Sequence, residues 1–195
     1  MKNASSVVPL LLVLAACNGA PTMTATPGAI GFEEDLVGWH AASTGGKGRT
    51  ASWEQGSDRD PVTKPNVLAV TSINHTSESR FNIYWTDTVR FEHGILAVAV
   101  RGDDGVIDQG GGPMWRVQDE NNYYVCRFNP LEANYRVYVV ENGVRRQLAT
   151  ALAAVAAGKW HRIEVEHTGT QIRCWLDGKK LLEVRDDTIQ AAGGG

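Results

Sequence analysis

The second half of the chain reads as one β-hairpin after another, and this pattern constrains the fold more than any other feature. β-Rich runs at residues 160–167, 171–176 and 180–184 are separated by Thr-Gly-Thr and Asp-Gly, and the run at 135–140 is followed by Asn-Gly. Asn-Gly and Asp-Gly favour two-residue hairpin turns, because both turn residues must tolerate positive φ. The sequence therefore predicts an antiparallel, all-β domain.

Shorter β-type runs extend this pattern toward the N-terminus. The other runs that we interpret as strands lie at residues 30–35, 51–55, 66–70, 80–85, 94–101, 112–118 and 123–129. Residues 39–49 and 102–112 are rich in Gly and small polar residues and are predicted loops, and 147–155 is predicted as a weak strand and loop. About twelve strands at this spacing predict a two-sheet jelly-roll sandwich rather than βαβ units.

Length and charge narrow the class of protein. A chain of 195 residues with 43% hydrophobic residues suits one domain with a sizeable core. The formal net charge of −3 argues against a nucleic-acid partner, which would require a basic face.

The N-terminus has the pattern of a targeting segment. A positive charge at Lys2 is followed by an apolar run, and Leu14-Ala-Ala-Cys17 resembles the lipobox of bacterial lipoproteins. The resemblance implies a signal peptide at 1–17 and a lipid on Cys17 that anchors the protein to the bacterial cell envelope, periplasmic or outer-surface. The alternative is an ordinary secretory signal. Residues 18–29 are small and polar with two prolines, which predicts a flexible tether before a domain at 30–195.

Two cysteines fall within the predicted domain. Strict alternation places Cys126 and Cys174 on the apolar faces of their strands, so both point inward. They are then either two buried free thiols or an inter-sheet disulfide formed in an oxidising compartment. A metal site is disfavoured, because no second Cys or His lies at ligand spacing.

Three successive strands carry polar side chains opposite their apolar faces. The residues are Arg116, Gln118, Arg127, Asn129, Arg136 and Tyr138. If the strands are neighbours, these side chains form one polar patch on an exposed sheet face. Such groups hydrogen-bond sugar hydroxyls or carboxylates, and Tyr adds an apolar surface. The patch is therefore a candidate ligand-binding face, and the alternative is an ordinary solvated face.

Carboxylates occur at two other places of interest. Asp103, Asp104 and Asp108 share one Gly-rich loop and are weak calcium candidates, because calcium prefers hard oxygen ligands; the alternative is a plain loop. Glu164 and Glu166 share one face of a strand, but ion pairs with neighbouring arginines explain them without catalysis.

Several strings resemble the concanavalin A-like lectin/glucanase fold of the laminin-G-like type. They are similar above all to bacterial 3-keto-disaccharide hydrolase and family-sixteen-like domains. The matching pieces are Trp53 with Pro65-Asn-Val-Leu-Ala69, Trp115-Arg-Val-Gln-Asp119, Asn122-Tyr-Tyr-Val125, Arg127-Phe-Asn129, Trp160-His161 and Leu176-Asp-Gly-Lys179. The resemblance implies a jelly roll over residues 30–189 but is weak for activity, since this superfamily holds lectins, glucanases and adhesion modules.

The chain departs from these relatives in two ways. Related domains continue past the position of residues 191–195 into further strands, so we expect a domain that lacks its C-terminal strand or strands; alternatively the N-terminal strands close the sheet. The Glu-x-Asp-x-x-Glu string of laminarinase-type enzymes is also missing. We therefore expect a noncatalytic carbohydrate-binding module for a carbohydrate or envelope glycan. The alternatives are a glycoside hydrolase-like enzyme and a structural or adhesion module that binds protein.

Overall fold

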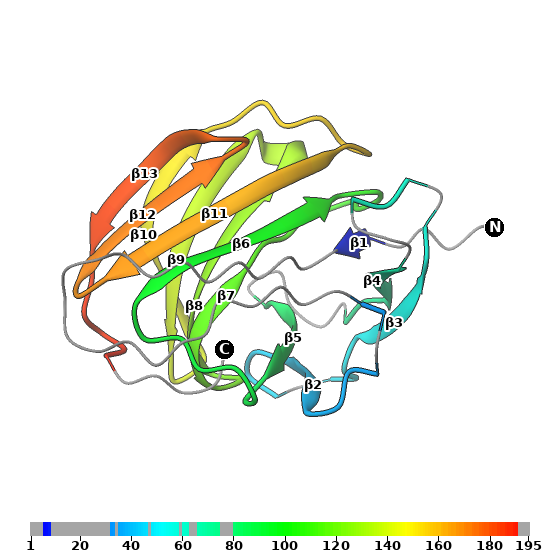
Figure 1. The fold of residues 1–195 in the computed structure, drawn as a ribbon, viewed down its shortest axis with the longest axis horizontal. Coiled ribbons are helices and arrows are strands. Elements are labelled where there is room, and N and C mark those ends of the chain that lie inside the picture. The colour runs from blue at the N-terminus through cyan, green and yellow to red at the C-terminus, as the bar shows by residue number, and fades with distance from the viewer. Residues whose placement is uncertain are drawn as a thin grey trace.

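The described residues form an all-β sandwich, as the hairpin pattern predicts (Figure 1). The computed structural model describes residues 6–8, 32–33, 35–46, 48–58, 60–62, 66–74 and 80–190. The first strands are β1 (Ser6–Val8), β2 (Trp39–Ser43), β3 (Ser52–Ser57), β4 (Asn66–Ser72), β5 (Asn82–Thr86), β6 (Gly94–Arg101) and β7 (Met114–Asp119). They are followed by β8 (Asn122–Asn129), the 3-10 turn η1 (Pro130–Glu132), β9 (Asn134–Glu141), β10 (Val144–Leu152), β11 (Trp160–Thr168), β12 (Gln171–Leu176) and β13 (Lys179–Arg185).

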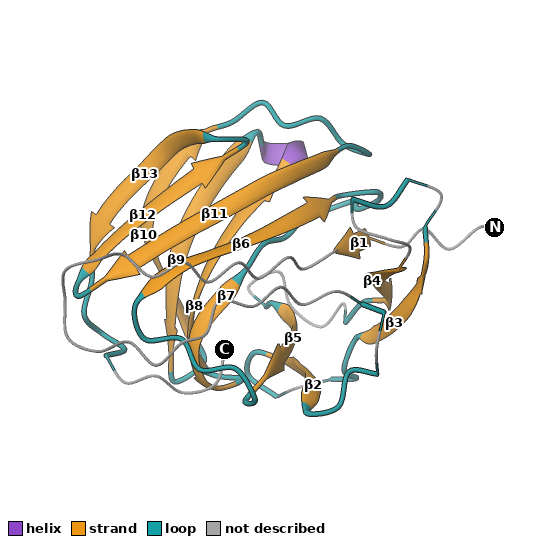
Figure 2. Cartoon of the chain, in the orientation of Figure 1, coloured by secondary structure: helices purple, strands orange, loops and turns teal. Residues whose placement is uncertain are grey.

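The strands form two stacked antiparallel sheets and a small third one (Figure 2). The order in the large sheet is β13-β12-β11-β6-β1-β4-β3, and the order in the second sheet is β10-β9-β8-β7. β2 and β5 pair with each other as a separate ribbon. This architecture confirms the jelly-roll prediction. Of the predicted signal segment, only β1 is described, and it lies between β4 and β6; Cys17 and the tether lie outside the described residues.

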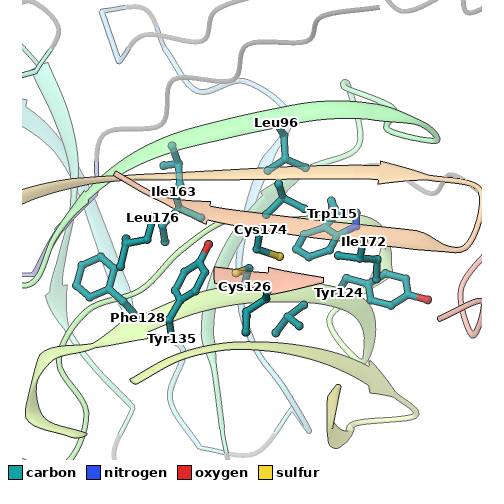
Figure 3. Packing of buried hydrophobic residues seen from close by; sticks show 14 of the residues in the cluster. Leu96, Trp115, Tyr124, Cys126, Phe128, Tyr135, Ile163, Ile172, Cys174 and Leu176 are labelled. Atoms are coloured by element: carbon teal, nitrogen blue, oxygen red, sulfur yellow. The ribbon is translucent and has the colours of Figure 1, made fainter. Parts of the chain in front are cut away.

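The main core lies between the two large sheets (Figure 3). Tyr124, Cys126 and Phe128 alternate along β8 and are all fully buried, as their spacing predicts. Across the core, Cys174 is also fully buried, and both thiols are free. A hydrogen bond with Cys126, followed by burial, raises the pKa of the Cys174 thiol, so both sulfurs behave as small core groups.

The outer face of the four-stranded sheet is not an open surface. Val117, Tyr123 and Val125 on this face form a second apolar cluster with Ile83 of β5. Phe81 and Trp85 pack against the same cluster. The β2–β5 ribbon and its flanking residues therefore cover part of the face that the sequence predicts to be solvent-exposed.

Two of the predicted element boundaries are wrong. Phe32 and Glu33 lie in a bend rather than in a strand; Phe32 is fully buried, and its carbonyl oxygen accepts a 2.7 Å hydrogen bond from the Gln55 side-chain amide rather than from a strand backbone. The predicted loop at 39–49 begins with β2 instead, which pairs with β5 over all five of its residues. The aromatic contacts of Trp39, described below, stabilise that strand.

Candidate functional site

A cavity of about 280 Å³ is lined by strands of both large sheets and by the β2–β5 ribbon, and one part of its lining is aromatic. Trp39 of β2 and Trp53 of β3 both stack on Tyr84 of β5, with ring centroids 5.5 and 5.4 Å apart. All three side chains are half-buried, and burial raises the pKa of the Tyr84 hydroxyl. Three strands that are distant in sequence therefore build one stack of rings beside the cavity.

The polar wall of the cavity comes from β8 and the loop before β7. It includes Asp104, Asp108, Gln109, Arg127 and Asn129. Asp104 and Asp108 are exposed whereas the other three are buried, so the cavity opens to solvent at the two carboxylates.

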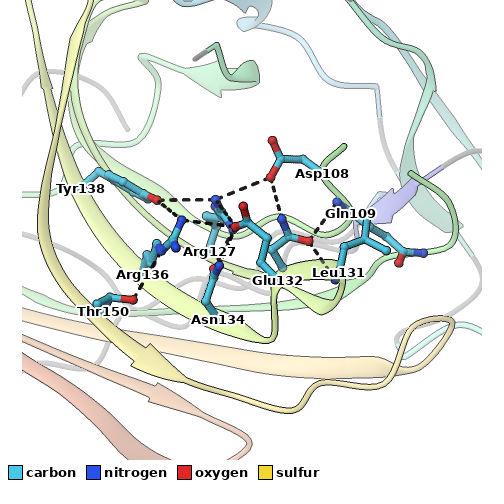
Figure 4. Close-up of polar contacts among 10 residues, drawn as sticks. Asp108, Gln109, Arg127, Leu131, Glu132, Asn134, Arg136, Tyr138 and Thr150 are labelled. Carbon is cyan, nitrogen blue, oxygen red and sulfur yellow. Dashed lines mark hydrogen bonds and ion pairs between the residues drawn. The ribbon is translucent and has the colours of Figure 1, made fainter. Parts of the chain in front are cut away.

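Arg127 is held within a polar network at this wall (Figure 4). Its guanidinium donates to the Asn134 amide oxygen at 2.9 Å and lies 3.6 Å from both Asp108 and Glu132. The Tyr138 hydroxyl is 3.5 Å away. Only 9% of the Arg127 side chain is exposed, so its charge is matched by carboxylates at close range rather than by water.

Asn129 ties the loop at residues 102–113 to β8 and to η1. Its amide oxygen accepts from the backbone of Gln109 and of Leu131, and its amide nitrogen donates to Asp108 at 2.7 Å. Asn129 is 1% exposed, so these bonds satisfy a buried amide. Gly110 allows the close approach, because its φ is +116° and a Cβ there would lie 2.6 Å from the Phe128 carbonyl oxygen.

Arg136 joins Tyr138 in this network, whereas Gln118 and Arg116 do not. Arg136 lies 3.2 Å from Glu132 and 3.5 Å from the Tyr138 hydroxyl. The Asn134 amide, which donates to Glu132, lowers the pKa of that carboxyl, and the nearby arginines act in the same direction. Gln118 is exposed near the C-terminal end of β7. The structure therefore groups Arg127, Asn129, Arg136 and Tyr138, as their alternation predicts.

Arg116 lies elsewhere, and the prediction that it shares the patch is wrong. Its φ is +49°, and the pairing of β7 with β8 shifts register between Trp115 and Asp119. This bulge turns the side chain away from its neighbours on β8. The buried guanidinium donates to the carbonyl oxygens of Glu92, Gly169 and Ile189. Burial lowers the pKa of the Arg116 guanidinium. Through these hydrogen bonds Arg116 joins three loops.

The three loop aspartates do not converge. Asp103 pairs with Arg101 at 2.7 Å, Asp104 accepts from the Gly105 backbone, and Asp108 faces Arg127 and Asn129. Within the described part of the chain, no three His, Cys, Asp or Glu side chains are grouped to hold a metal ion. The side chains of these three aspartates therefore do not surround one point at which a calcium ion could bind.

The carboxylates of β11 form the ion pairs that the sequence predicts. Glu164 lies 3.0 Å from Arg162, and Glu166 lies 3.0 Å from Arg173 on β12. Neither glutamate lines the cavity.

Comparison with known protein families matches residues 31–194 to the 3-keto-alpha-glucoside-1,2-lyase-like domain. The chain belongs to this family. Among solved structures, the fold is similar to the carbohydrate binding module CBM66 from Bacillus subtilis, with a TM-score of 0.58 and 14% sequence identity. That match covers 80% of this chain and 85% of the module. A search of curated proteins finds no match. No helix in the described residues is long and apolar enough to span a membrane.

Proposed function

We propose that this family member binds a neutral carbohydrate in this cavity. The observation that carries the proposal is that the stacked rings of Trp39, Tyr84 and Trp53 line the same cavity as the polar wall around Arg127 and Asn129. Sugars have an apolar C–H face and a hydroxyl edge, so they complement one aromatic wall and one hydrogen-bonding wall.

The charges of the cavity favour an uncharged ligand. Two arginines, Arg80 and Arg127, and two aspartates, Asp104 and Asp108, line it. Arg127 is already matched by Asp108 and by Glu132 outside the cavity. A uronate or a sulfated sugar would have to compete with these carboxylates, whereas hydroxyl groups can share them as hydrogen-bond acceptors.

The volume favours a small ligand. About 280 Å³ is near the lower end of the range for ligand pockets, roughly 300–1,000 Å³. It suits one or two sugar units rather than a long stretch of polysaccharide. The similarity of the fold to a carbohydrate binding module supports the class of ligand.

The proposal is tested by titrating the full chain with the methyl glycosides of glucose, galactose, mannose and fructose in a calorimeter. We expect at least one to bind and the Trp53→Ala variant to lose that binding. The matched control is Trp160→Ala, because Trp160 lies against Arg101 and does not line the cavity. A folded protein that binds none of the sugars, or a Trp53→Ala variant that binds as well as the native chain, contradicts the proposal.

Family membership favours a second function, the lyase reaction for which the family is described. An elimination next to a ketone needs a base that removes the proton beside the carbonyl. The carboxylates that line the cavity in the described residues are Asp104 and Asp108, and Asp108 lies beside the buried guanidinium of Arg127. The test is to incubate the chain with a 3-keto-α-glucoside and look for the unsaturated product. A product that persists in Asp108→Asn would remove Asp108 as the base.

We also propose that Cys17 carries a lipid that anchors the domain to the cell envelope, since Leu14-Ala-Ala-Cys17 resembles a lipobox. Expression in bacteria with a labelled fatty acid should label the full chain but not its Cys17→Ala variant. Equal labelling of the two proteins, or no labelling of either, would contradict this anchor.

A further inference from the structure

The loop that forms the polar wall of the cavity carries two apolar side chains at its tip. Val106 is 93% exposed and Ile107 is 61% exposed. The residues on either side of them, Gly105 and Asp108, both line the cavity. Chain continuity therefore places the apolar tip at the rim of the opening that Asp104 and Asp108 mark.

The tip is held in place rather than free to collapse onto the core. A Cβ on Gly105 would lie 2.1 Å from the Asp108 carbonyl oxygen, so the chain turns back tightly across the tip. The Asp108 carboxylate is bound by Asn129, and the Gln109 side chain donates to the Gly102 carbonyl oxygen at 3.1 Å. The loop thus presents Val106 and Ile107 to solvent from a fixed base.

A fixed, exposed pair of branched apolar side chains is poised to cover an apolar group. Such a group would gain from leaving water, while the loop would lose little conformational freedom on binding. A ligand whose sugar fills the cavity would extend past Asp108 toward this tip.

We propose that Val106 and Ile107 form a subsite for an apolar aglycone, so that the preferred ligand is a glycoside with an alkyl or aryl group rather than a free sugar. This inference rests on the proposed sugar site and names the class of glycoside that the site selects. Each methylene that becomes fully buried should tighten binding by about fourfold. Partial cover of a hexyl chain by the two side chains should therefore give roughly a tenfold preference over the methyl glycoside.

The test compares the methyl and hexyl glycosides of whichever of the four sugars binds the full chain most tightly. We expect the hexyl glycoside to have the lower Kd. We expect the double variant Val106→Ser/Ile107→Ser to lose this preference while its Kd for the methyl glycoside stays unchanged. The matched control is Val144→Ser, because Val144 is 69% exposed in the turn-proximal part of β10 and does not line the cavity.

Each outcome decides between the two proposals. If no methyl glycoside binds, the sugar site is refuted, and the aglycone subsite that rests on it is refuted as well. If methyl and hexyl glycosides bind equally, or if the double variant keeps the preference, the sugar site stands and the subsite is refuted. If Val144→Ser abolishes the preference as well, the effect is not specific to the loop tip and the subsite is refuted.

Discussion

His167 should make the stability of this protein depend strongly on pH. The ring is fully buried, and its Nδ1 accepts a 2.9 Å hydrogen bond from the Trp115 indole. The neutral ring therefore carries its proton on Nε2, which is buried and has no hydrogen-bond partner. Burial, followed by the nearby charge of Arg116, lowers the pKa of His167 from 6.5 to about 3.

The sign and size of the effect follow from the two pKa values. Between pH 6.5 and about 3 the unfolded chain binds a proton at His167 that the folded chain does not, so stability is lost as the pH falls through this window. Above pH 6.5 both states are neutral at this ring and the contribution vanishes. Moving from pH 8 to pH 5 should cost about 2 kcal/mol from this group alone.

The assay is urea denaturation of the native chain and the His167→Gln variant at pH 8 and pH 5. Gln cannot titrate in this range, and its amide oxygen can accept the hydrogen bond from Trp115. Each protein is compared with itself at the two pH values, so a pH-independent cost of the substitution cancels. The native chain should lose about 2 kcal/mol more than the variant between the two pH values. His40→Gln is the control, because half of the His40 side chain is exposed. This variant should keep the pH dependence of the native chain. Equal losses in the native chain and His167→Gln would refute the reasoning.

One further substitution tests the site, and one thiol-labelling experiment tests the core. Asn129→Ala should lower the free energy of unfolding by about 1–3 kcal/mol, because it leaves the buried backbone donor of Gln109 without an acceptor and also removes the part-buried bond to the Leu131 backbone. Urea denaturation measures this loss, and an unchanged midpoint would show that Asn129 does not anchor the loop. Cys126 and Cys174 should resist a thiol reagent in the folded protein, because both are fully buried. Both should react in denaturant, because both are free thiols. If neither reacts after unfolding, the two cysteines form a disulfide instead.

Local rules account for most of the second half of the fold. Asn142 and Asp177 have φ of 51° and 49° in their hairpin turns, as the Asn-Gly and Asp-Gly pairs predict. The inward positions of Cys126 and Cys174 follow from period-two alternation within their strands. These features could be predicted because turn chemistry and side-chain alternation act over only a few residues.

The features that could not be predicted depend on contacts between distant elements. The bulge at Arg116 breaks the alternation of β7, and a positive φ at an arginine has no signal in the sequence. No local pattern indicates that the β2–β5 ribbon covers the outer face of β8. The aromatic wall has no local signal either, because Trp39, Trp53 and Tyr84 come from three separate strands.

This arrangement changes which residue can test the function. An open sheet face would let ligand meet Arg127 and Asn129 directly, but both are buried and line the cavity instead. Both also hold the loop and η1 in place, so their truncation would alter the cavity whether or not they touch a sugar. Loss of binding in Arg127→Ala would therefore be ambiguous. Trp53 has no part in that polar network, so a loss of binding in a folded Trp53→Ala variant would assign the ligand to the aromatic wall that Trp53 forms with Tyr84.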